Sequence, residues 1–352
     1  MWTFSPIPIV QAPMAGSQDA GLCIAVCEAG GLGSIPAAML TPATLREEIL
    51  RVRAGTAAPF NVNFFAHATP DPDPAAEARW RERLSCYYAE HGLEASGSSG
   101  PTRAPFDAAM CEIVEALKPE IVSFHFGLPA PDLFARVKAI GAKVFSSATT
   151  VEEAKWLDAR GVDVIIAQGR EAGGHRGLFL SDDLDAQPGL FALLPQVVDA
   201  VRVPVIATGG IGDGRGVAAA FALGACAAQI GTAYMRTPQA KTTPVHRAAL
   251  EQARDDATRL TNLFSGRPAR GLLNRLMREV GPTSADLPAF PLAAAAVAPL
   301  RVAAEKQGRG DFSPLWSGEA GALAREEDAG EATRRFWREA QAAMRGLAER
   351  GA

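Results

Sequence analysis

The sequence predicts an α/β fold, a (β/α)8 TIM barrel, from two observations. Short, almost uniformly apolar runs alternate with helix-length segments through most of the chain, and eight such runs fall within about 230 residues. Uniformly apolar runs indicate strands that are covered on both faces, as in a parallel sheet. Because parallel strands need helical crossovers, eight strand-then-helix units favour a closed barrel over an open sheet.

The elements follow one another in a regular order along this part of the chain. The predicted strands are residues 8–12, 31–35, 60–64, 121–126, 143–147, 162–167, 204–208 and 227–231. The helices expected between them include residues 42–53, 106–117, 131–140, 151–160, 191–201 and 214–223.

Two stretches interrupt this alternation. Residues 66–105 are far longer than an ordinary loop and hold three prolines, a charged helical segment at 75–91 and a flexible glycine–serine stretch at 95–100. We expect them to form an insertion on the surface of the barrel. After Thr237 the strand pattern stops.

The segments after Thr237 are expected to be helical. The predicted helices are residues 243–260, 269–279, 291–307 and 331–350, and the predicted loops are residues 282–288 and 308–321. This pattern divides the chain into a barrel at residues 1–240, with the insertion at about 66–105, and a helical C-terminal region at residues 241–352. We expect that region to pack on the barrel and to contribute to the substrate pocket.

Composition excludes several classes of partner. The 352 residues include 35 Lys and Arg against 39 Asp and Glu, a net charge of −4, so the chain lacks the basic excess of a dedicated nucleic-acid binder. Prolines interrupt its most apolar late run, residues 287–300, which argues against a membrane span. Five cysteines without a CxxC pair, and an N-terminus without a secretory leader pattern, favour the cytoplasm. The oligomeric state stays open.

Glycines gather after the seventh and eighth predicted strands, where a barrel places its active site. Residues 208–214 contain four glycines, and the eighth strand runs into Gly231 and Thr232. Glycine lets backbone N–H groups approach a phosphate closely, and the dipole of an adjoining helix N-terminus favours the anion. The alternative is a pair of ordinary turns. No P-loop or dinucleotide fingerprint is present, so a phosphate site here suggests a mononucleotide such as FMN.

Two histidines are expected on the same rim. His175 stands among Gly173, Gly174 and Gly177 after the sixth strand, and His125 ends the fourth strand. An imidazole held near a ligand can act as a general base or a hydrogen-bond donor, although a lone histidine is often structural. We expect His67, His91 and His246 to be solvated or structural. No zinc-ligand spacing and no GxSxG elbow occur, so we predict no metal site.

Six ordered motifs resemble the nitronate monooxygenase family, formerly called 2-nitropropane dioxygenases. They are residues 11–16, 61–65, 123–127, 168–177, 207–211 and 229–232, and a late element at 312–318 resembles the family's LWxGQ segment. The resemblance implies an FMN-containing TIM barrel that oxidises alkyl nitronates, such as propionate 3-nitronate, with O2 to a carbonyl compound and nitrite.

The resemblance also implies roles for individual residues. Those expected to bind FMN are Ala12, Pro13, Met14, Asn63, Gln168, Gly173, Gly174, Gly209, Gly210, Gln229, Ile230, Gly231 and Thr232. His175 matches the catalytic histidine, which would position the nitro group or remove the α-proton of a neutral nitroalkane. His125 matches a second active-site histidine and would hold negative charge, either protonated or as a hydrogen-bond donor.

One segment departs from the family pattern. Where relatives that act on propionate 3-nitronate tend to show YPxxYxxxK, this chain has Phe290, Ala294 and Ala298 at the two tyrosines and the lysine. The expected pocket wall is smaller, more apolar and without that cation, so a less polar nitronate or a different electron donor is an alternative. Two other functions stay open: an NAD(P)H-dependent FMN reductase for a quinone or an enoyl thioester, and a flavin-binding scaffold or sensor without turnover.

Overall fold

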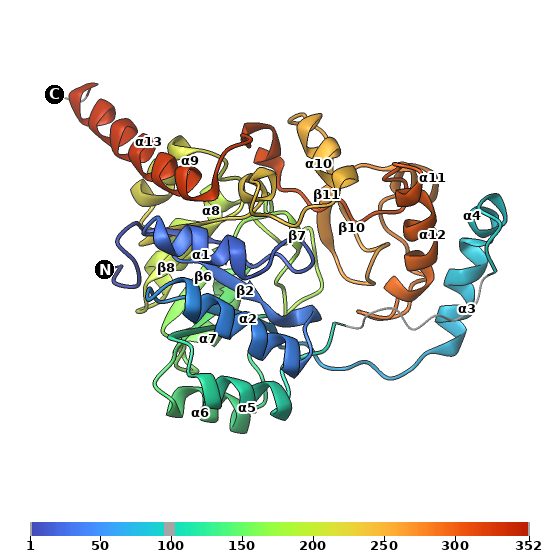
Figure 1. Ribbon diagram of the computed structural model, residues 1–352, viewed down its shortest axis with the longest axis horizontal. Helices are drawn as coiled ribbons and strands as arrows, with labels where there is room; N and C mark the ends of the chain where they lie inside the picture. The colour runs from blue at the N-terminus through green and yellow to red at the C-terminus, as the bar shows by residue number, and fades with distance from the viewer. Residues whose placement is uncertain (1, 95–102, 351–352) are drawn as a thin grey trace.

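A computed structural model describes residues 2–94 and 103–350, so the glycine–serine stretch at 95–100 lies outside the described residues. Its main feature is an eight-stranded parallel sheet in the order β1-β9-β8-β6-β5-β4-β3-β2 (Figure 1). A parallel bridge between Val10 and Leu32 joins the two ends of that order and closes the barrel. The barrel strands are β1 Ile9–Gln11, β2 Ser34–Pro36, β3 Asn61–Phe65, β4 Ile121–His125, β5 Lys143–Ala148, β6 Val164–Gln168, β8 Val205–Thr208 and β9 Ala227–Ile230. All eight predicted strands are confirmed.

Helices surround the barrel, and the six predicted between strands are confirmed. They are α2 Pro42–Gly55, α5 Ala108–Leu117, α6 Pro131–Ala139, α7 Val151–Asp158, α8 Leu190–Ala200 and α9 Gly214–Ala222, with α1 Ala20–Glu28 and the short 3-10 helix η1 Ala37–Met39 also on this part of the chain. Local sequence sets where they begin. The Thr41 hydroxyl accepts a hydrogen bond from the Thr44 amide at the start of α2.

Side chains alternate between the inside and the outside of the barrel along each strand. On β4, Ile121 packs in the barrel interior while Val122 and Phe124 pack in the outer core under the helices. Phe4 closes the N-terminal end of the barrel, with its ring centroid 5.0 Å from that of Phe145. The C-terminal end of the barrel is thereby left as the place for a cavity.

The region after Thr237 differs from the all-helical expectation. A second, antiparallel sheet contains β10 Thr258–Thr261, β11 Ala269–Leu272 and β7 Gly174–His175. The predicted helix at 243–260 ends early, as α10 Pro244–Glu251, and the first four residues of the one predicted at 269–279 form β11, with α11 Arg275–Val280 following. The difference comes from tertiary contacts rather than from local sequence. β11 takes its hydrogen bonds from partner strands on both sides, which a local pattern cannot show.

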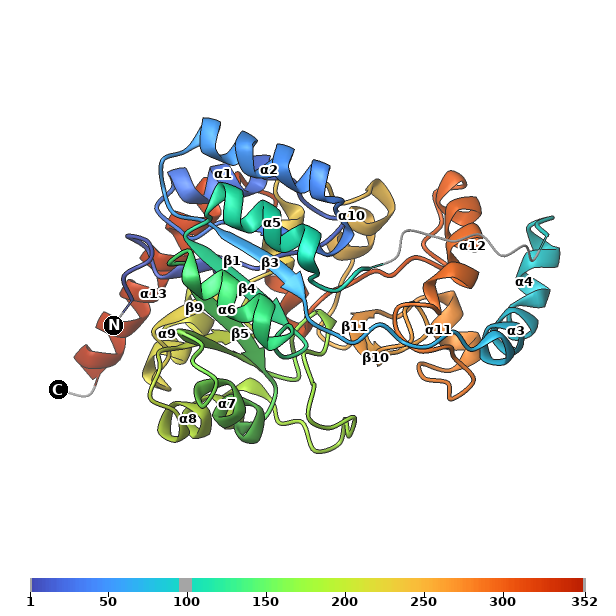
Figure 2. The ribbon, with the colours of Figure 1, turned by 90° about the horizontal axis from the view of Figure 1, so that it is seen from below.

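The insertion packs against the C-terminal region, outside the barrel. Its helices α3 Pro74–Arg83 and α4 Ser85–Glu90 lie beside α12 Ala294–Lys306 in both views (Figures 1 and 2). The Trp80 indole donates to the Ala293 carbonyl at 3.3 Å, and the Tyr88 hydroxyl donates to the Ala296 carbonyl at 2.6 Å. We call α3, α4, β10, β11, α11 and α12 the second lobe. The arrowhead of β3 points toward it (Figure 2).

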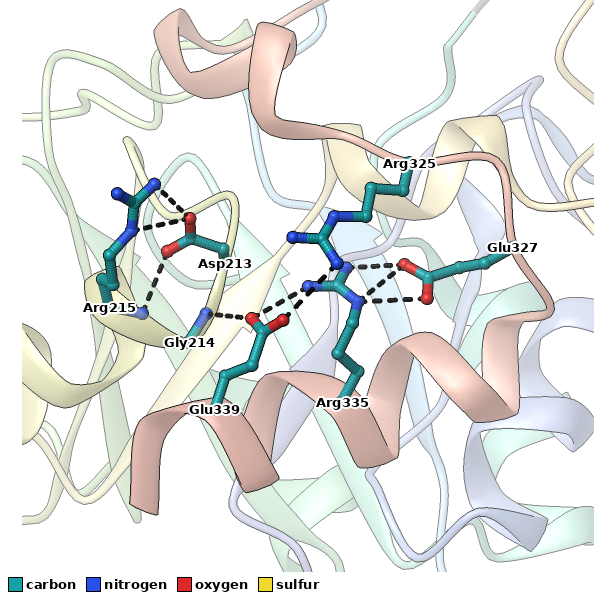
Figure 3. Close-up of polar contacts among 7 residues, drawn as sticks. All are labelled: Asp213, Gly214, Arg215, Arg325, Glu327, Arg335 and Glu339. Carbon is teal, nitrogen blue, oxygen red and sulfur yellow. Dashed lines mark hydrogen bonds and ion pairs between the residues drawn. The ribbon is translucent and has the colours of Figure 1, made fainter. Parts of the chain in front are cut away.

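The last helix, α13 Ala329–Arg350, returns to the barrel and packs along α9 and α1 (Figure 1). Two short 3-10 helices precede it, η2 Thr232–Arg236 after β9 and η3 Glu319–Leu323. Arg335 of α13 is almost fully buried and lies between Glu327 and Glu339, bonding both carboxylates at 3.0 Å (Figure 3). Among the described helices, none is long and apolar enough to cross a membrane.

Candidate active site

A cavity lies at the C-terminal mouth of the barrel, and strand alternation explains which side chains reach it. Asn63 on β3, His125 on β4, Gln168 on β6 and Thr208 on β8 all stand on the interior face of their strands and line this cavity. They replace the apolar residues that fill the interior deeper down, such as Ile121 and Val164. The barrel therefore ends in a polar ring at the depth where a ligand can bind.

The structure brings nearly all of the sequence-predicted site residues to this cavity. On its wall are Ala12, Pro13, Met14, Asn63, His125, Gln168, Gly173, Gly174, His175, Thr208, Gly209, Gly210, Gln229, Gly231 and Thr232. Ile230 is the exception. Gln229 faces the cavity, so the next residue along β9 faces outward, and the Ile230 side chain is buried in the outer core.

Backbone amides could hold an anion on one side of the cavity. Gly209 and Gly210 have φ of 110° and 67°, conformations that favour glycine and let the chain turn with its backbone close to a ligand. Opposite the Ala12 side chain, Gly231 precedes Thr232, where η2 begins. Loops after the last two barrel strands, together with a short extra helix, form the phosphate site of many barrels.

The expected contribution of the α9 N-terminus is not available. Its first amide, Gly214 N–H, donates to the Glu339 carboxylate at 3.2 Å, and the next, Arg215 N–H, donates to Asp213 at 2.9 Å (Figure 3). Carboxylates thus already occupy this helix end. We correct the prediction: the amides left for an anion are those of the glycine loops and of η2.

His175 is fixed by the second sheet. It belongs to β7, whose register pairs His175 with Ala269 of β11, so the glycine–histidine loop is held as a strand. Its Nε2 lies 2.9 Å from the Ser265 hydroxyl, whereas Nδ1 has no hydrogen-bond partner among the described residues. The rings of Phe290 and Trp316 contact the imidazole at centroid distances of 5.3 and 5.5 Å. Burial lowers the pKa of His175 well below its usual value, and the positive charge of Arg103 adds to this effect.

His125 is neutral, and both of its ring nitrogens form hydrogen bonds with protein groups. The carbonyl of His175 can only accept, so His125 Nε2–H donates to it at 3.2 Å, and Nδ1 accepts from the Ser147 hydroxyl at 2.7 Å. Burial lowers the pKa of His125 to about 3. The low pKa therefore favours the hydrogen-bonding alternative for His125 over the protonated one. In this structure its hydrogen bond holds the His175 loop.

The amide side chains of the polar ring differ in which of their polar atoms are hydrogen-bonded within the protein. Gln168 donates to the His175 carbonyl at 3.0 Å and accepts from the Gly177 amide at 2.8 Å, so it also holds the loop. Asn63 donates to the Ser123 hydroxyl at 2.9 Å. In contrast, the Gln229 side-chain oxygen is buried without a hydrogen-bond partner among the described residues. A ligand that enters the cavity can supply the donor that this oxygen lacks.

Sequence reasoning missed three contributors to this site. Trp316 belongs to a motif but had no role assigned to it, Ser265 had no signal of its own, and Arg103 lies in the insertion. Contacts across the fold bring these residues to His175 or to the cavity wall. Composition or spacing could not have selected them.

The fold and the cavity define an enzyme of the (β/α)8-barrel class, with a histidine and glycine loops on the wall of one cavity. The family model "Nitronate monooxygenase" matches residues 1–333, and the chain belongs to the nitronate monooxygenase family. The chain is 41% identical to a nitronate monooxygenase of Paraburkholderia phytofirmans over 94% of this chain and 92% of that one. It is likewise 41% identical to one of Pseudomonas aeruginosa, over 93% and 94% of the two chains.

Solved structures agree with this assignment. A nitroalkane oxidase from Streptomyces ansochromogenes superposes with a TM-score of 0.89 at 40% identity and covers 98% of both chains. A FabK structure from Thermotoga maritima is more distant, with a TM-score of 0.74 at 27% identity over 98% of this chain and 96% of that one.

Proposed function

We propose that the protein is an FMN-dependent nitronate monooxygenase that oxidises alkyl nitronates with O2 to carbonyl compounds and nitrite. The observation that carries this proposal is the position of His175 on the wall of the cavity that the glycine loops also line. Membership of the nitronate monooxygenase family supports it, as does the likeness to a nitroalkane oxidase. The partners of such an enzyme are its small-molecule substrate and O2.

The residues of the cavity fit an FMN molecule. Gly209, Gly210 and the start of η2 offer backbone amides to a phosphate, and the buried Gln229 oxygen accepts from a polar group of the cofactor. The segment Ala12–Met14 offers small and flexible side chains to a flat ring system. When bound, FMN supplies the electron transfer between the substrate and O2.

The protein supplies orientation and proton handling. His175 is neutral, and its Nδ1 has no hydrogen-bond partner within the described part of the chain, so this atom can take the α-proton of a neutral nitroalkane. A nitronate has already lost that proton, and His175 then positions its nitro oxygens. The rings of Phe290 and Trp316 exclude water around the imidazole, which strengthens these polar contacts.

A second candidate is an NAD(P)H-dependent FMN reductase, which the structural similarity to FabK supports. Anaerobic mixing with NADH or NADPH separates the two functions. Rapid bleaching of the flavin supports the reductase. Absence of bleaching, together with aerobic release of nitrite from nitronates of several lengths, supports the monooxygenase. A scaffold without turnover would release no nitrite at all, and a pure protein that is colourless and refuses added FMN would contradict every flavin-based proposal.

A further inference from the structure

Arg103 is the one Lys, Arg, Asp or Glu among the described residues that line the cavity. It stands at the end of the insertion, where the Phe106 amide donates to the Phe65 carbonyl at 2.7 Å and returns the chain to β3. The insertion therefore delivers a single fixed positive charge to a wall that is otherwise polar-neutral, glycine-rich and aromatic.

Within residues 2–94 and 103–350, the Arg103 guanidinium has no carboxylate within 4.0 Å and no hydrogen-bond acceptor. Two other buried arginines of this molecule are paired with carboxylates. Arg270 bonds Glu319 at 3.0 Å and the Arg170 carbonyl, and Arg335 bonds two glutamates. Burial lowers the pKa of Arg103, and the nearby charge of Arg301 adds to this effect. A partly buried guanidinium that lines the cavity without an acceptor among the described residues is available to pair with an anionic ligand.

The strand order indicates on which side of the barrel mouth Arg103 lies. Arg103 follows β3, whereas the glycine loops follow β8 and β9, and β3 and β8 stand four places apart in the eight-stranded ring. Arg103 thus lies across the barrel mouth from the amides that would hold a phosphate. It lies on the side of His175 instead: the His175 ring centroid is 6.2 Å from that of Phe65 at the end of β3, and the charge of Arg103 contributes to the depressed pKa of His175.

We propose that Arg103 is the substrate-binding cation of this enzyme and forms an ion pair with the negative charge of a nitronate. This inference rests on the proposed function and names the residue that selects the ionic form of the substrate. Both histidines are neutral, so the described wall offers an anion no other full charge. A planar guanidinium matches the two oxygens of a nitronate group. Arg103 also corrects the expectation of a wall without a cation: Phe290 and the alanines of α12 replace the family's lysine segment, while the cation comes from the insertion.

The test uses the two ionic forms of one compound, propyl-1-nitronate and neutral 1-nitropropane, which differ by a single proton. In FMN-loaded Arg103→Gln, kcat/KM for the nitronate should fall about 10- to 100-fold, the range for one lost charge-assisted hydrogen bond, mainly through KM. The value for neutral 1-nitropropane should change less than about threefold. Arg103→Lys should restore part of the loss.

A matched control removes one positive charge outside the cavity. Arg301 lies on α12, bonds Glu305 at 3.1 Å and does not line the cavity, so Arg301→Gln should behave as the wild type. A second readout needs no turnover: titration with nitrate, a flat anion, followed by the flavin absorbance. The Kd for nitrate should rise about tenfold in Arg103→Gln, while the FMN content and the melting temperature stay unchanged.

Equal losses on the two ionic forms, or an unchanged nitrate Kd, would overturn the assignment. Loss of FMN from both Arg103 variants would overturn it too, because Arg103 would then serve the cofactor. Failure of the wild type to release nitrite from either form would sink the proposed function instead. The nitrate titration would still decide whether Arg103 binds anions.

Discussion

The Ser265 hydroxyl lies 2.9 Å from Nε2 of His175 and within 3.3 Å of the Arg267 carbonyl. That carbonyl can only accept, so the hydrogen-bond network assigns a chain in which His175 Nε2–H donates to Ser265 and Ser265 donates to Arg267. These hydrogen bonds leave the lone pair of His175 on Nδ1, the ring nitrogen for which residues 2–94 and 103–350 provide no partner. Ser265 is therefore a positioning residue for the candidate base.

Replacing Ser265 with Ala removes the hydrogen-bond partner of His175 Nε2. The imidazole of His175 can then adopt another tautomer or orientation. We expect kcat on neutral nitroalkanes to fall about tenfold, because a base must present its lone pair to the α-carbon. Turnover of preformed nitronates, which need no deprotonation, should fall less. Initial rates of nitrite release on both forms check this, and FMN content serves as the control. An equal fall on both forms contradicts the positioning role.

His175→Asn should retain FMN but lose the base. Turnover of neutral nitroalkanes should fall by about 100-fold or more, the contribution of a general base, with a smaller effect on nitronates. His246→Gln, which alters a histidine outside the cavity, is a matched control. Rates equal to those of the wild type would remove His175 from the chemistry.

Gly210→Asp should cost FMN occupancy. The new carboxylate would face the cofactor's phosphate, and its Cβ would lie 3.3 Å from that of Glu171 at a φ of 67°. Gly141→Asp is the control for strain alone, because Gly141 also has a positive φ, 85°, but nothing within 4 Å of an added Cβ. The flavin absorbance per protein should fall only in the first variant. Normal flavin content in Gly210→Asp would refute the assignment of the glycine loops to the FMN phosphate.

Stability should decline as the pH falls, partly through His246. Burial lowers the pKa of His246 to about 4, from 6.5, so below pH 6.5 the unfolded chain binds a proton that the folded chain does not. Between pH 6.5 and 4 this lowers the free energy of unfolding by about 1.4 kcal/mol per pH unit. Urea unfolding at pH 7, 6 and 5 should show a shallower slope in His246→Gln. Identical slopes would contradict the assignment.

Arg335→Met should destabilise the attachment of α13. Removing the buried guanidinium leaves Glu327 and Glu339 without their shared partner, at a cost of about 1–3 kcal/mol. Arg325, which is 59% exposed and 3.6 Å from Glu339, provides the control, since Arg325→Met should cost less than about 1 kcal/mol. Chemical unfolding of both variants checks the difference. Equal costs would place the stabilisation elsewhere.

Periodicity and glycine placement were enough to predict the barrel and most of its rim. Buried parallel strands are apolar throughout, and a barrel gathers strand ends at one mouth, so His125, Gln168 and Gly210 could be placed together from order alone. The same alternation could have shown that Ile230 points outward. The strands at 258–261 and 269–272 escaped prediction because their stabilising partners lie far away in sequence.

The sequence by itself determined the fold class, the family and the set of residues on the rim, because these depend on local patterns and on strand order. Tertiary structure decided the chemistry of that rim. Pairing with β11 fixed His175, burial made both histidines neutral, and Glu339 of α13 occupied the α9 N-terminus. The insertion carried Arg103 to the cavity. Desolvation and long-range pairing set these properties, and neither is encoded in any single segment.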